Sequence, residues 1–84
     1  MTVTLQPARV VTGAEEEGML VFAGRGLVAV LVHLSDENEI APGDWYLEAG
    51  FGCLGGPRHP TFPSLEAAQD WIVQRLRWSG RRSR

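Results

Sequence analysis

The clearest alternation of apolar and other residues lies in segment 45–53. On an extended chain, Trp45, Leu47, Ala49, Phe51 and Cys53 would all fall on one side, which is typical of a half-buried strand. We therefore predict a strand over residues 45–53 whose apolar face includes a buried Cys53 thiol.

Two continuous apolar runs, residues 19–23 and 27–34, flank the sequence Gly24-Arg25-Gly26. A single strand across both runs would be about 53 Å long at about 3.3 Å per residue, which is too long for a small domain. We predict a hairpin turn at Gly24–Gly26, because glycine supplies the positive φ that tight turns require. The alternative is one long strand kinked at a glycine bulge.

The C-terminal part of the chain has the periodicity of one amphipathic helix. Its main apolar stripe consists of Leu65, Ala68, Ile72 and Leu76. Ser64 follows a proline and is a favoured helix N-cap. The pattern predicts a helix over residues 65–78 that ends at Ser79-Gly80.

These elements predict a single α+β domain over residues 1–78, followed by a flexible basic tail over residues 79–84. The fold is an antiparallel three- or four-stranded meander with one C-terminal α-helix packed on one face. The stretch TFPSLEAAQDWI, residues 61–72, resembles the start of the helix in phage integrase arm-binding domains, which are three-stranded sheets followed by a helix. Those domains read DNA with basic residues on the sheet, and segment 45–54 contains none.

Segment 27–34 is apolar on both sides, although one helix covers only one face of a sheet. The second face could be covered by the N-terminal segment 2–12, by a second copy of the chain, or by a partner. Two helix tryptophans seven residues apart add a further apolar flank. We predict a homodimer through the second sheet face or this flank, with self-association residues Leu27, Leu31, Trp71 and Trp78.

The length and composition of the chain limit it to one small domain without an internal disulfide. It has 84 residues and a mass of 9.2 kDa, and its single cysteine excludes an internal disulfide. No apolar run approaches the roughly 18–20 residues that span a bilayer. The N-terminus lacks the pattern of a secretory signal, so we expect a cytoplasmic protein.

Charge is distributed unevenly along the chain. All ten acidic residues lie within residues 1–74, which contain only three arginines and therefore have a net charge of −7. Five arginines give the last ten residues, 75–84, a charge of +5. Two acidic segments, residues 12–18 and 35–44, are predicted loops. A hairpin at Gly24–Gly26 would place both loops at the same end of the sheet, whereas a kinked single strand would place them at opposite ends. The predicted acidic face consists of Glu15, Glu16, Glu17, Asp36, Glu37, Glu39 and Asp44.

Few residues carry the chemistry of a catalytic or metal site. Residues 50–55 match the glycine fingerprint of dinucleotide sites, but three prolines precede the predicted helix, whose N-terminus would have to bind pyrophosphate. Cys53, His33 and His59 are the candidate nucleophile or metal ligands, and we predict a core thiol, an edge histidine and a solvated histidine instead. We expect no enzyme activity, no cofactor and no metal.

The charge pattern favours an interaction protein. We expect its acidic face to dock onto a basic, nucleic-acid-handling protein as an inhibitor or regulator. Phage-encoded inhibitors of CRISPR complexes have this role and are similar to this chain in size and charge. The alternative is weak DNA binding or regulation through the arginine-rich tail, with phosphate contacts from Arg77, Arg81, Arg82 and Arg84. Because the rest of the chain is acidic, direct nucleic-acid binding is disfavoured.

Overall fold

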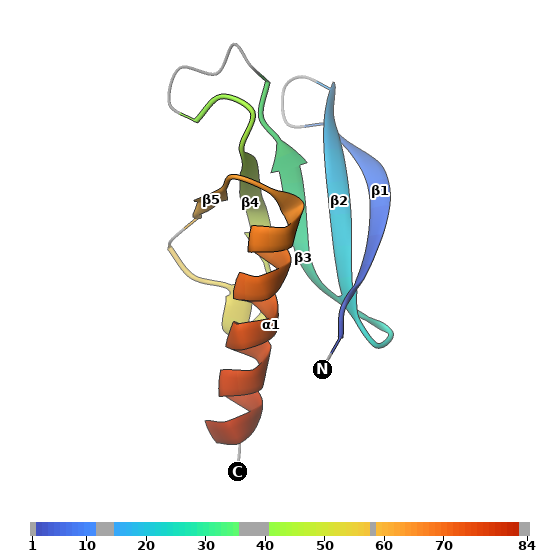
Figure 1. The fold of residues 1–84 in the computed structure, drawn as a ribbon. Helices are drawn as coiled ribbons and strands as arrows, with labels where there is room; N and C mark the ends of the chain where they lie inside the picture. The colour runs from blue at the N-terminus through green and yellow to red at the C-terminus, as the bar shows by residue number, and fades with distance from the viewer. Residues whose placement is uncertain (1, 12–14, 36–40, 58, 83–84) are drawn as a thin grey trace.

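The computed structural model shows an antiparallel sheet with one long helix across one face (Figure 1). It describes residues 2–11, 15–35, 41–57 and 59–82, with the backbone alone for residues 15–16 and 79–82. The sheet order is β1-β2-β3-β4-β5, and every neighbouring pair is antiparallel. The elements are β1 (Thr4–Val11), β2 (Glu15–Ala23), β3 (Gly26–His33), β4 (Trp45–Gly50), the 3₁₀ turn η1 (Gly52–Leu54), β5 (Thr61–Phe62) and α1 (Leu65–Arg82).

The α+β class, the meander and the single C-terminal helix are confirmed, but the sheet has five strands. β1 is a complete edge strand despite Pro7, which is tolerated because an edge strand leaves one side of its backbone unpaired. The two-residue strand β5 lies between Pro60 and Pro63 and pairs with the start of β4.

The turn between β2 and β3 is the predicted hairpin. Ala23 pairs with Gly26, so Gly24 and Arg25 are the two turn residues. Gly24 has φ +62°, as the first central residue of a type II′ turn requires. The alternative of one kinked strand is therefore wrong.

Two element boundaries differ from the predicted ones. Residues 15–17 are not loop but the first residues of β2, because β1 extends far enough to pair Val11 with Glu15 and Arg9 with Glu17. The helix does not end at Ser79-Gly80 but continues to Arg82. A glycine inside a helix costs only about 1 kcal/mol, and the arginines beside it are good helix formers.

The main core lies between α1 and one face of the sheet. Leu31 in β3 and Leu47 in β4 pair directly and are fully buried, as are Ala68 and Ile72 of the helix stripe. Leu31 therefore cannot be a self-association residue, and that part of the prediction is wrong. It faces the helix together with Ala29.

A β-bulge in β4 reverses the predicted alternation. Leu31 pairs with Leu47 and Val30 with Ala49, so Glu48 is the extra residue. Directly opposed residues share a face of the sheet. Leu47 therefore lies on the helix-covered face, whereas Ala49 lies on the second face of the sheet. The next residue, Gly50, pairs with Ala29 and is again on the helix-covered face.

No described element packs across the second face of the sheet, although Val32 on this face, which pairs with Gly18 and Tyr46, is fully buried. Leu20, Phe22 and Val30 belong to this face by their register and are half-buried. The N-terminal segment does not cover it, because β1 joins the same sheet as an edge strand. A second copy of the chain or another partner stays a prediction for this face.

Ser64 caps the helix as predicted: its Oγ accepts a hydrogen bond from the backbone N–H of Ala67 at 3.1 Å. We expect Ser64→Ala to lower the free energy of unfolding by about 1 kcal/mol, because that amide would lose its partner. Chemical denaturation would measure the loss, with Ser64→Asp as the control that restores a capping oxygen. Equal stability of Ser64→Ala and the unaltered protein would contradict the role of the cap.

Candidate functional site

Four of the acidic residues that the structure describes, Glu15, Glu16, Glu17 and Asp44, lie at one end of the sheet, while Glu48 lies in β4 and Glu66 and Asp70 lie in α1. β1 ends and β2 begins at the same end at which β3 ends and β4 begins (Figure 1). Glu17, with an exposed side chain, and the half-buried Asp44 both flank this end. We call the residues 15–17 and 44 the acidic end. Asp36, Glu37 and Glu39 lie outside the described residues.

Asp44 is held in place by a small set of backbone hydrogen bonds. Its carbonyl oxygen accepts from the Leu34 N–H at 2.8 Å, and its own N–H donates to Ala41 O at 3.2 Å. The Gly43 N–H donates to Ser35 O at 3.2 Å, and Gly43 adopts φ +76°. Residues 34–35 and 43–44 therefore lie side by side at this end of the sheet.

His33 strengthens this anchor. Its Nε2–H donates to the carbonyl oxygen of Gly43 at 3.1 Å, and its ring stacks on Trp45 with centroids 4.5 Å apart. His33 is therefore a partnered structural histidine at the end of β3, as the sequence predicted.

The arginine-rich end of α1 lies at the opposite end of the molecule (Figure 1). Arg77 is exposed, and the backbone of Arg81 and Arg82 continues the helix. Arg84 lies outside the described residues. The longest dimension of the fold is 44 Å, so the arginine-rich end of α1 and the acidic end are separated along its long axis.

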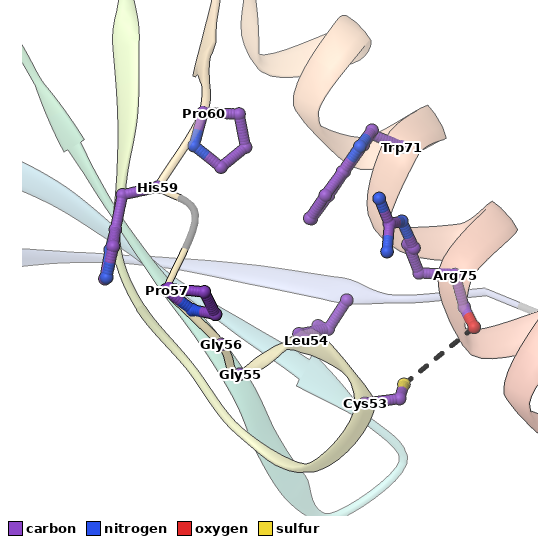
Figure 2. Close-up of a pocket in the computed structure, with 9 residues that line it drawn as sticks. All are labelled: Cys53, Leu54, Gly55, Gly56, Pro57, His59, Pro60, Trp71 and Arg75. Carbon is purple, nitrogen blue, oxygen red and sulfur yellow. Dashed lines mark hydrogen bonds between the residues drawn. The ribbon is translucent and has the colours of Figure 1, made fainter.

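A cleft of about 550 Å³ separates α1 from the chain that follows β4 (Figure 2). The wall of the cleft opposite α1 depends on Gly50. A Cβ atom added to Gly50 would lie 2.2 Å from the carbonyl oxygen of Leu54. The chain therefore folds back over Gly50 and buries Leu54 in the core. Gly52 and Gly56 adopt φ +61° and +144°, values that favour glycine.

The helix wall of the cleft is formed by Trp71 and Arg75, one turn apart. The Arg75 guanidinium carbon lies 4.7 Å from the centroid of the Trp71 ring. The ring centroids of Trp71 and Phe62 are 5.4 Å apart. The opposite wall consists of the glycine- and proline-rich segment after η1. The complete lining is Cys53, Leu54, Gly55, Gly56, Pro57, His59, Pro60, Trp71 and Arg75.

Cys53 is exposed, so the prediction of a buried core thiol is wrong. The strand ends at Gly50, and Cys53 lies in η1, where its Sγ contacts the Arg75 carbonyl oxygen at 3.8 Å. His59 is exposed but not simply solvated: its Nδ1–H donates to Leu47 O at 2.8 Å and its ring stacks on Tyr46. Among the described residues, no three His, Cys, Asp or Glu side chains converge as a metal site.

The remaining self-association residues are separated by the fold. Leu27 is exposed and pairs with Phe22, which places it on the uncovered sheet face, whereas Trp78 is exposed on α1 and Trp71 lines the cleft. Sequence reasoning placed Trp71 on an interaction flank and missed the cleft. The available signal was a Trp–Arg pair at i, i+4 following a segment rich in glycine and proline.

Comparison with known proteins gives no matching family, no matching curated protein and no matching solved structure. No helix in the described part of the chain is long and apolar enough to cross a membrane.

Proposed function

We propose that this protein is a small, non-enzymatic cytoplasmic interaction protein that docks its acidic end onto a basic, nucleic-acid-handling protein as an inhibitor or regulator. The observation that carries this proposal is the topology of the sheet. The Gly24–Gly26 hairpin places the β1–β2 and β3–β4 connections at one end, so that residues 15–17 at the start of β2 and Asp44 before β4 lie at that end. In size and charge the chain is similar to phage-encoded inhibitors of CRISPR complexes.

The separation of charge means that the arginines of α1 do little to weaken the negative field at the acidic end. The arginines of α1 lie toward the other end of a fold 44 Å long, whereas charges are screened over about 8 Å at physiological ionic strength. Arg9 stands opposite Glu17 in the β1–β2 register and offsets part of the local charge. A field of this kind accelerates association with a basic surface and makes binding depend on salt.

We expect the triple variant Glu15→Gln, Glu16→Gln, Glu17→Gln to bind a fluorescein-labelled nona-arginine peptide about tenfold more weakly at low salt. Each exposed ion pair contributes about 0.2–1 kcal/mol, so three lost charges produce an effect of this order. Fluorescence anisotropy would measure the dissociation constant at several salt concentrations.

The matched control removes three acidic residues that are not part of the acidic end, Glu48→Gln in β4 and Glu66→Gln and Asp70→Asn in α1. The net charge changes equally, and we expect less than a twofold effect. Equal losses in both variants would mean that net charge alone governs binding, which would overturn the proposal. Tighter binding of labelled duplex DNA than of the peptide, lost on truncation after Trp78, would favour the arginine tail instead.

A further inference from the structure

The cleft between α1 and segment 53–60 has a chemical character unlike the rest of this acidic protein. Arg75 is the one permanent charge among its described lining residues, and none of them is a carboxylate. The other groups offer apolar surface or backbone: Leu54, Pro57, Pro60 and the glycines between them. A negatively charged group inside the cleft would therefore meet one cation and no neighbouring acid.

Arg75 is oriented for this task by Trp71. The guanidinium lies 4.7 Å from the indole centroid, and Phe62 supports the indole from the sheet. A guanidinium presents its N–H groups as a planar fork from which a carboxylate can accept two hydrogen bonds. Because the side chain already lies over the indole ring, less conformational entropy is lost when an anion binds.

The opposite wall leaves room beside Arg75. Figure 2 shows Pro57 and Pro60 facing the helix across the cleft, while the His59 ring points toward β4. That ring is engaged by Leu47 O and Tyr46, and the Cys53 Sγ contact with Arg75 O joins the two walls at one end. The volume of about 550 Å³ lies within the range of small-molecule sites, roughly 300–1,000 Å³.

We propose that this cleft binds a small organic carboxylate with a compact apolar body. The carboxylate pairs with the Arg75 guanidinium, and the apolar body lies against Trp71, Leu54 and Pro60. A cationic ligand would be repelled by Arg75. This site is distinct from the acidic end and does not depend on the function proposed for it.

The test is a titration of the full chain with naphthalene-1-acetate. Nuclear magnetic resonance that resolves individual N–H groups would monitor the titration. We expect the shifted signals to be the backbone amides of Gly55 and Gly56 and the indole N–H of Trp71. The neutral isostere naphthalene-1-acetamide should bind about tenfold more weakly, because it cannot form the charge-assisted pair. Equal affinity of acid and amide, or shifts confined to Leu20, Phe22 and Val30 of the uncovered sheet face, would overturn the proposal.

Two arginine variants test whether Arg75 is the residue that pairs with the carboxylate. Arg75→Gln should weaken naphthalene-1-acetate binding about tenfold and abolish the preference for the acid over the amide. Arg77→Gln removes an exposed arginine of the same helix that does not line the cleft, and it should bind like the unaltered protein. Unchanged binding by Arg75→Gln would overturn the assignment. Should that variant not fold, the acid and amide comparison on the unaltered chain decides the proposal alone.

Discussion

We expect the Leu31→Ala variant to lose about 3 kcal/mol of unfolding free energy, because truncating a buried leucine leaves a cavity that its neighbours fill only in part. Leu31 has no exposed surface and pairs with Met19 on one side and Leu47 on the other, beneath α1. A domain of this length has a total stability of roughly 4–12 kcal/mol. Urea denaturation should show a markedly lower midpoint with little change in slope.

Leu27→Ala is the matched control within the same strand. Leu27 is 37% exposed on the uncovered face, so the same truncation should cost less than about 1 kcal/mol. A loss as large as that of Leu31→Ala would mean either that Leu27 lies on the helix-covered face or that another surface, such as a second copy of the chain, buries it in solution.

The second large effect is expected at Gly50. A Cβ atom on Gly50 would lie 2.2 Å from the carbonyl oxygen and 2.7 Å from the carbonyl carbon of Leu54, which are backbone atoms that cannot rotate away. Gly50→Ala should therefore destabilise the protein by about 2–3 kcal/mol, as overpacking in a core does. Thermal and urea denaturation would both report the loss.

Gly26→Ala is the control for the loss of a strand glycine. An added Cβ there would meet only Ala23 O at 3.7 Å, an ordinary contact, and Gly26 does not have a positive φ. This substitution should be neutral or stabilise by up to about 1 kcal/mol, because alanine restricts the unfolded chain. If Gly50→Ala were equally well tolerated, the fold-back of Leu54 over Gly50 would be contradicted.

The acidic end could be anticipated from the sequence, while the cleft could not. The charge runs are visible in the sequence, and a hairpin at Gly24–Gly26 is enough to bring both connections to one end. The cleft instead depends on Leu54 reaching the core and on α1 lying opposite Pro57. Those contacts join residues far apart in sequence, which local patterns do not encode.

The same distinction explains the two faces of β3. Both rows of this strand are apolar, so periodicity does not show which one lies beneath the helix. The bulge at Val28 places Leu27 and Leu31 on opposite faces, and the bulge at Glu48 reverses the alternation of β4 before Gly50. A one-residue shift in register moves every later side chain to the other face. The prediction for Cys53 failed for a related reason, since it assumed an uninterrupted strand.

The elements with local signals follow from the amino-acid order alone: the glycine turn, the alternation of Trp45 and Leu47, and the Ser64-capped helix with its apolar stripe. Each depends on residues within a few positions of one another, where backbone preference and side-chain period are sufficient. Three other features follow from the folded chain instead: which strand face is covered, where the bulges lie, and that Trp71 and Arg75 face a cleft. These features are set by packing between distant segments, because the free energy of burial depends on which surfaces meet.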